Sequence, residues 1–294
     1  MQGDKLKSYL HLHLIVFVWG FTAVLGALIS LEALPLVWFR MSIAVALTFL
    51  YALFTKTPLK ISLKTFLGFM AAGLVIALHW FTFFQAIKVS NISVTLACLS
   101  TGAFFTCFME PIFFGRKIIL YEVFFGLLVI AGLYIIFSFE GNYLNGILLA
   151  LSSAFLSATF SIINGKYAVQ YNPVTISFYE LLGGVFFFSI YLLFSGRFTT
   201  EFFQLSASDW QWLFILGSVC TAYAFIASVQ VMKFLSPYTV MLTINMEPVY
   251  GIILAVLVFH DKEKMSTSFY IGAAIILTTV ILNGILKNRT KKAN

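Results

Sequence analysis

The sequence predicts an all-α membrane protein in which ten transmembrane helices form two inverted five-helix repeats. The 294 residues are 61% hydrophobic and only 10% charged, whereas soluble domains contain about 25% charged residues. The chain divides into ten apolar runs, most of them close to the roughly twenty residues that a helix needs to cross a bilayer. Prolines and charged hinges also recur in the second half of the chain.

Each apolar run is expected to be a helix, because an open chain in lipid has no other way to satisfy its backbone hydrogen bonds. Pro35, Pro173 and Pro237 lie at the starts of the second, seventh and ninth runs, where the missing proline N–H costs little. The first run is too long for a secretory signal, and no small-residue cleavage site follows it. The predicted spans are 12–31, 35–54, 65–87, 91–114, 120–138, 144–163, 174–194, 210–232, 237–259 and 268–286.

The basic residues predict how the chain is oriented in the membrane. With the N-terminus inside, thirteen Lys and Arg side chains fall in cytoplasmic segments and four in external ones, and this excess orients the protein. Ten spans then place both termini in the cytoplasm, and we expect a multi-pass protein of the inner or plasma membrane. The formal charge of +7 therefore reflects topology and not a nucleic-acid partner. The external residues are Lys88, Arg197, Lys262 and Lys264.

An internal repeat relates the two halves of the chain. Pro35 and Pro173 lie about 138 residues apart, and short charged hinges at 115–117 and 260–264 follow the fourth and ninth runs. We expect one repeat over residues 1–140 and a second over 141–294, integrated into one transport domain. Because each repeat has an odd number of spans, the two have opposite orientations. Inverted repeats are typical of secondary transporters, whose substrate site lies near the midplane between the halves.

Several kinds of chemistry are missing from the sequence. No phosphate-binding loop and no metal-spaced cluster of ligands occur, so we expect no catalytic residues, no metal and no cofactor. Three cysteines lie within apolar runs as an odd, unpaired set, which favours small buried hydrophobes over a disulfide framework. An intramembrane enzyme or a sensor is the alternative from a different class, and the absent catalytic set argues against it.

Four motifs carry a family resemblance. They are FVWGFTAVLGAL in the first run, LPLVWFRMSIAVAL in the second, a Thr-Ala pair in the eighth, and Glu-Pro followed by a short hinge ending in Glu in the ninth. In this order the chain resembles the EamA family of the drug/metabolite transporter superfamily. The resemblance implies ten helices in two inverted repeats around a central cavity, cytoplasmic termini, and transport, often export, of amino acids or other small metabolites.

Residue by residue, the resemblance points to Trp19, Gly20, Arg40 and Glu247. The chain departs from the family pattern in its first-half hinge, which is basic where relatives often carry an acid. The Glu-Pro pair at 110–111 also lies nearer its hinge than the pair at 247–248 does. A symmetric role for the two acids is therefore not expected.

Glu247 is the strongest candidate that the residues themselves provide. It lies about ten residues into the ninth run, near the midplane, where a carboxylate costs about 2.5–3.5 kcal/mol. It either faces a cavity and binds an amine or a proton, or it forms a structural ion pair. Pro248 frees a carbonyl near Ile244, and Asn245 adds a polar group beside this break.

Five further residues are candidates for the substrate site. Arg40 either binds a substrate carboxylate with its guanidinium fork or snorkels to the outer interface. His79 either titrates during transport or stays neutral and hydrogen-bonded between helices. Trp19, Trp80 and Tyr223 could form the cavity wall, and simple packing is the alternative for each.

Two more buried acids lie toward the cytoplasmic side. Glu110 could snorkel or pair with its basic hinge, and Glu180 could line an inner vestibule. Together with Glu247 they are the candidates for proton binding or gating.

The sequence thus predicts a secondary exporter of small polar metabolites, amino acids above all, that works by alternating access in a lipid bilayer. A transporter of nucleoside-derived metabolites such as S-adenosylmethionine, or of drugs, is the alternative. Proton coupling and facilitated transport both remain open at this stage.

Overall fold

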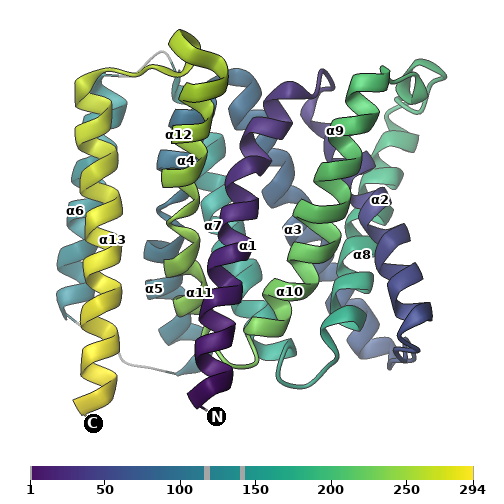
Figure 1. Ribbon diagram of the computed structural model, residues 1–294, viewed down its shortest axis with the longest axis horizontal. Coiled ribbons are helices and arrows are strands. Elements are labelled where there is room, and N and C mark those ends of the chain that lie inside the picture. Colours follow the sequence, from purple (N-terminus) through teal and green to yellow (C-terminus); the bar gives the residue numbers. More distant parts are fainter. Residues whose placement is uncertain (1, 116–119, 140–142, 294) are drawn as a thin grey trace.

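The computed structural model describes residues 2–115, 120–139 and 143–293, in which helices run along one common direction and both termini lie at the same end (Figure 1). Three shorter helices, η2, η3 and η4, join or interrupt the longer ones. The elements are α1 (Gln2–Leu28), α2 (Ala33–Phe54), α3 (Leu63–Val89), α4 (Ile92–Leu99), α5 (Gly102–Phe114), α6 (Leu120–Phe139), α7 (Leu144–Tyr167), α8 (Pro173–Phe194), η2 (Glu201–Phe203), α9 (Ala207–Gly217), η3 (Ser218–Tyr223), α10 (Ala224–Val231), α11 (Pro237–Ile244), α12 (Glu247–Phe259), η4 (His260–Glu263) and α13 (Thr267–Ala293).

These elements combine into ten spans in the described part of the chain. The fourth span is α4 with α5, the eighth is α9, η3 and α10, and the ninth is α11 with α12. Eight of the spans are long and apolar enough to cross a membrane, and α6 and α13 carry shorter apolar segments, Phe124–Ile136 and Thr267–Thr279. The all-α, ten-span prediction is confirmed. The predicted boundary between the repeats, at residues 140 and 141, lies outside the described residues.

Short polar residues fix where several helices begin. A side-chain oxygen at the N-cap accepts a hydrogen bond from a backbone N–H of the first turn, which otherwise has no partner inside the helix. Proline occupies the first turn of α8 and of α11, as predicted for Pro173 and Pro237. The capping residues are Ser62, Asn91, Asn172, Ser206 and Ser236.

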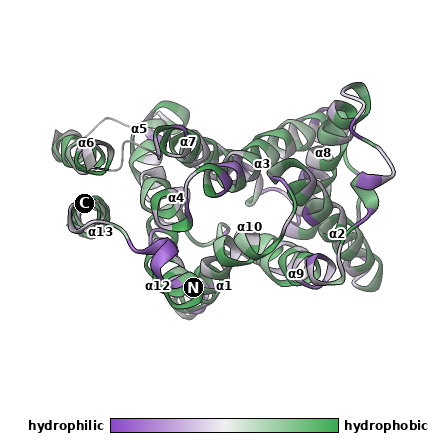
Figure 2. Ribbon diagram, turned by 90° about the horizontal axis from the view of Figure 1, so that it is seen from above, coloured by the Kyte–Doolittle hydropathy of each residue, from purple (hydrophilic) through white to green (hydrophobic). Residues whose placement is uncertain are grey.

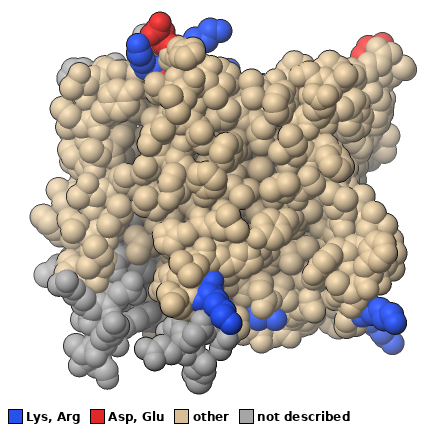
Figure 3. Space-filling model, in the orientation of Figure 1, with Lys and Arg blue, Asp and Glu red and all other residues tan. Residues whose placement is uncertain are grey.

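The surface has the charge distribution of a membrane protein. On the face shown in Figure 3, Lys, Arg, Asp and Glu gather at the two ends of the bundle, and an uncharged band separates them. Large apolar side chains such as Phe54, Phe194 and Leu257 are strongly exposed on the helices. A hydrocarbon environment accounts for such exposure, which a water-soluble protein of this size would not tolerate.

Helices α6 and α13 pair with each other on one lateral side of the bundle, set apart from the other helices (Figures 1 and 2). They cross at Gly132 and Gly272, where a Cβ on Gly272 would lie 2.8 Å from the Gly132 carbonyl oxygen. Small residues of this kind let two membrane helices approach closely. The fifth and tenth spans therefore lie at the edge of the bundle (Figure 2).

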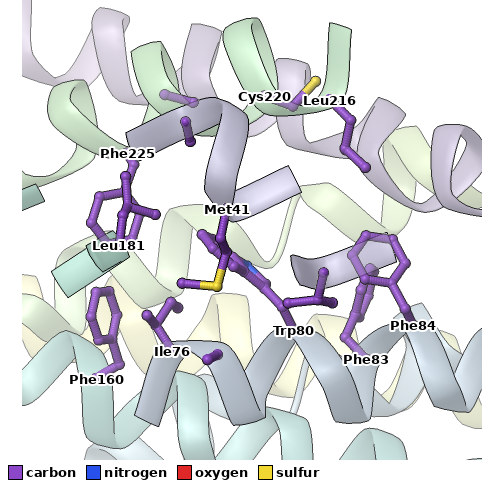
Figure 4. Packing of buried hydrophobic residues seen from close by; sticks show 14 of the residues in the cluster. Met41, Ile76, Trp80, Phe83, Phe84, Phe160, Leu181, Leu216, Cys220 and Phe225 are labelled. Atoms are coloured by element: carbon purple, nitrogen blue, oxygen red, sulfur yellow. The ribbon is translucent and has the colours of Figure 1, made fainter. Parts of the chain in front are cut away.

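Helix α3 lies inside the main bundle and packs against both α7 and α8. Its backbone approaches α8 at glycine: a Cβ on Gly183 would lie 2.8 Å from the carbonyl oxygen of Met70. Buried apolar side chains surround the middle of α3, with Met41 and Trp80 at the centre of the cluster in Figure 4. This packing fixes the helices that carry the candidate site.

Candidate functional site

A narrow cavity of about 70 Å³ lies between the helices of the two halves. Three ionisable side chains reach its wall, Arg40, His79 and Glu247. The volume holds about two water molecules and is far below the roughly 300–1,000 Å³ of a typical ligand pocket. A metabolite could enter only if the helices moved apart. The aromatic residues of the wall are Trp19, Trp80, Phe83, Phe160 and Phe225.

Arg40 of α2 is held inside the bundle, with an exposed fraction of 1%. Its Nε donates a hydrogen bond to Thr221 Oγ1 at 2.6 Å, and its Nη2 lies 3.5 Å from the carbonyl oxygen of Cys220. The guanidinium carbon lies 4.1 Å from the centre of the Trp80 ring, in cation–π contact. Nη1 is buried without a hydrogen-bond partner. Arg40 therefore does not snorkel to the outer interface, and its Nη1 group remains free to bind a ligand.

A π-helical turn, η3, presents the partners of Arg40. Thr221 Oγ1 donates to the Leu216 carbonyl five residues earlier, at 2.6 Å, so the same hydroxyl can still accept a hydrogen bond from Arg40. The carbonyl oxygen of Cys220 also accepts from Trp19 Nε1 at 3.2 Å. Single π turns often occur at functional sites. Hydropathy gave no signal for this turn, although the Thr-Ala pair of the family resemblance marks its position.

Glu247 is the first residue of α12, and the break between α11 and α12 places it at the cavity wall. Its exposed fraction is 6%. A negative charge is favourable at a helix N-terminus, because the first backbone N–H groups point toward it. Among the described residues it forms no direct ion pair with Arg40. The cavity thus carries a cation and an acid on different helices, each available to a ligand.

His79 of α3 is fixed by a single residue of α7. Its Nδ1 lies 2.9 Å from the Ser153 carbonyl oxygen, and the Ser153 hydroxyl donates to the His79 carbonyl at 3.0 Å. A carbonyl oxygen can only accept, so Nδ1 carries a proton. In the neutral ring Nε2 is then a hydrogen-bond acceptor. His79 is thus hydrogen-bonded between two helices and also lines the cavity, and its titration during transport stays a prediction.

Two predicted site residues do not reach the cavity. Tyr223 is 44% exposed, and its hydroxyl bonds to His11 Nε2 at 2.8 Å on another side of the bundle. The π turn ends at Tyr223 and shifts the register of the span, so its face differs from that of a regular helix. Asn245 is buried at the end of α11, beside the helix break and outside the cavity lining. Trp19 and Trp80 do lie in the wall as expected.

The other two acids are buried away from the cavity lining. Glu110 is the ninth residue of α5, with an exposed fraction of 1%. Glu180 of α8 has no exposed surface, and its Oε2 accepts from Asn164 Nδ2 at 3.1 Å. Neither snorkelling by Glu110 nor a vestibule position for Glu180 agrees with this burial.

Two acids outside the predicted site, Glu263 and Asp209, bind backbone groups at the end of the bundle opposite the termini. The carboxylate of Glu263 in η4 accepts from the backbone N–H groups of Ile92 and Ser93 at 3.0 and 2.9 Å, which caps the start of α4. Asp209 similarly accepts from the Ser30 backbone and hydroxyl, both at 2.7 Å. The hinge ending in Glu was visible in the sequence, but its partner lies 171 residues away.

Comparison with known proteins identifies the family. The profile of the EamA-like transporter family matches residues 6–138 and 144–285. The chain belongs to this family. It is therefore a multi-pass membrane transporter with two EamA domains, and it is not a member of an enzyme family. The resemblance predicted from the four motifs is confirmed.

Solved structures share the fold of this EamA protein. One protein known from a crystal structure is 15% identical, with 96% of this chain and 98% of the other chain covered and a TM-score of 0.71. At that level of identity the similarity establishes the fold alone. No match was found among curated proteins.

Proposed function

We propose that this EamA protein is a secondary exporter of small zwitterionic metabolites, and of amino acids first, in the inner or plasma membrane. The observation that carries the proposal is the free Nη1 of Arg40 on the same cavity as Glu247. An amino acid presents a carboxylate and an ammonium group a few bonds apart. Arg40 would bind the carboxylate, since a guanidinium matches its planar geometry, and Glu247 would bind the ammonium group.

The rest of the wall suits the side chain of such a substrate. Phe83, Phe160 and Phe225 provide apolar surface, and the Nε2 acceptor of His79 adds one polar position. The face of Trp80 is already covered by Arg40. A nucleoside-linked amino acid such as S-adenosylmethionine remains the second candidate, because it carries the same two charges and its base would contact the aromatic wall. An uncharged drug would leave Arg40 and Glu247 unpaired, which is costly in a buried site.

The two ends of the bundle differ in how they are closed, and this difference supports alternating access. Polar contacts of Glu263 and Asp209 close the end opposite the termini. The cavity lining instead includes Met232, which follows α10, and Val240 of α11, and both helices lie toward the end where the termini lie (Figure 1). With cytoplasmic termini, a movement of the helices apart at this end would load substrate from the cytoplasm. Release to the outside would then require the Glu263 and Asp209 contacts to open while the cytoplasmic end closes.

Counterflow in proteoliposomes tests the proposal, because exchange needs no driving force. Labelled neutral L-amino acids should exchange, and unlabelled amino acids should compete. Amines that lack the carboxylate, and N-acetyl derivatives that lack the ammonium group, should compete about 10- to 100-fold less well, since a hydrogen bond to a charged group contributes about 1.5–3 kcal/mol.

The Arg40→Lys variant should lose the preference for the carboxylate, because lysine lacks the planar fork. Arg197→Lys, in the loop between α8 and η2, is the matched control and should behave like the unmodified protein. Competition by nucleosides or drugs without competition by amino acids would contradict the proposal.

A further inference from the structure

A fully buried polar group lies outside the cavity, at the contact of α7 and α8. The side chains of Glu180, Asn164 and Ser177 have no exposed surface. One hydrogen bond joins two of them, from Asn164 Nδ2 to Glu180 Oε2. Glu180 Oε1, Asn164 Oδ1 and Ser177 Oγ are all buried without a partner. Buried oxygen atoms of this kind are rarely left unsatisfied without a functional reason.

No cation neutralises Glu180 in the described part of the chain. Asn164 and Tyr167 of α7 are the polar groups that interact with its carboxyl. On α3, Gly73 packs against the backbone of Glu180, and among the described residues α2, α3 and α10 bring no charged side chain that interacts with the carboxyl. An isolated carboxylate is too costly to bury in an apolar medium. A proton on the carboxyl removes the charge.

A polar face of α7 links this group to the cavity. Ser153, Ser157, Ser161 and Asn164 lie at positions i, i+4, i+8 and i+11, which share one side of a helix. Ser153 bonds to His79, and Ser157 and Ser161 line the cavity. Asn164 lies three residues beyond Ser161, a rise of about 4.5 Å. The partner of Glu180 is thus one turn from the substrate site.

We propose that Glu180 carries the exchangeable proton of the transport cycle and that the polar face of α7 couples this proton to the occupancy of the cavity. In the described state the carboxyl is protonated and buried. When the helices move apart, the O–H bond breaks and the proton leaves to the side then open, as Glu180 becomes a solvated carboxylate. The inference rests on the proposed transport of zwitterions. It assigns the proton gradient as the driving force of that transport.

The experiment separates exchange from coupled transport, using proteoliposomes that contain the full chain and labelled leucine, threonine and phenylalanine. The unmodified protein should accumulate label in response to a pH gradient, and a trapped pH dye should report proton movement when substrate is added. Glu180→Gln should keep counterflow but lose both responses, because an amide cannot release a proton. Glu110→Gln, a buried acid of α5 outside this face, should keep all three.

Three results would overturn the inference. One is gradient-driven accumulation that survives in Glu180→Gln, and another is counterflow in the unmodified protein without any response to pH. Accumulation driven by a sodium gradient alone would also overturn it. Absence of counterflow would instead count against the proposed substrates.

If no counterflow is seen, a measurement without substrate still tests whether Glu180 carries the proton. Infrared difference spectra between acid and alkaline buffers should show a carboxylic acid band in the unmodified protein and in Glu110→Gln. Glu180→Gln should remove one component of that band, the rest of which comes from the other acids, and a spectrum unchanged by the substitution would contradict the proposal. If the Gln variant does not fold, Glu180→Asp should fold, retain coupling and shift its pH profile. An unshifted profile would count against Glu180.

Discussion

The fourth and ninth spans are built alike but differ in the chemistry of their breaks. Each is an eight-residue helix followed by a thirteen-residue helix, α4 with α5 and α11 with α12. In the first half the second helix begins with Gly102, which packs against Met241 and Ala154. In the second half it begins with Glu247. The same backbone geometry therefore places a packing residue in one half and an acid in the other.

The two breaks also have different causes. Thr101 Oγ1 donates to the Cys98 carbonyl at 2.7 Å, and such bonds from threonine to the preceding turn bend helices. The second break precedes Pro248, which has no N–H to offer to Ile244. Pro111 is the tenth residue of α5, well after the break. The two Glu-Pro pairs are thus unrelated by the repeat, and only one of them shapes the cavity.

The largest expected effect distinguishes the two acids. Glu247→Gln should lower amino-acid counterflow about 10- to 100-fold, because a neutral amide binds an ammonium group less strongly than a carboxylate does. Glu110→Gln should leave counterflow close to that of the unmodified protein. Both variants should be compared at equal amounts of folded protein, judged by gel filtration in detergent. Equal losses in the two variants would show that the halves contribute symmetrically.

The two prolines provide a test of intermediate size. Pro248→Ala restores an N–H that can join α11 to α12, which would turn the carboxyl of Glu247 away from the cavity wall. Because a small misplacement of a binding group is costly, we expect a loss of about tenfold in counterflow. Pro111→Ala restores a bond within α5 and should leave counterflow unchanged while raising the melting temperature slightly. A harmless Pro248→Ala would mean that the break does not position Glu247.

The smallest effect concerns stability and the hinge after the ninth span. Glu263→Gln should lower the free energy of unfolding by about 1–2 kcal/mol, because it weakens the cap that joins η4 to the start of α4. Asp261→Asn in the same hinge is the control, since Asp261 is 87% exposed and pairs only with Lys264 among the described residues. Thermal unfolding in detergent measures both variants. A melting temperature that is unchanged in Glu263→Gln would show that this cap does not stabilise the closed end opposite the termini.

The sequence predicted the spans well, because every span in lipid must be an apolar helix that satisfies its own backbone hydrogen bonds. The third span was placed at 65–87, and α3 runs from Leu63 to Val89. Pro248 also signalled the break in the ninth span. The break in the fourth span was missed, because serine and threonine occur inside many helices without bending them. The π turn was missed for a similar reason, and with it the direction of Tyr223.

The sequence by itself determined the membrane environment, the ten helices, the family and the identity of Arg40, His79 and Glu247 as candidates. Hydropathy and short motifs are local properties, so they can be read from consecutive residues. Only the tertiary structure decided that Arg40 is buried on Thr221, that Glu263 caps α4, and that Asn164 holds Glu180. These pairs join distant segments, and apolar helices carry no pattern that specifies which faces will meet.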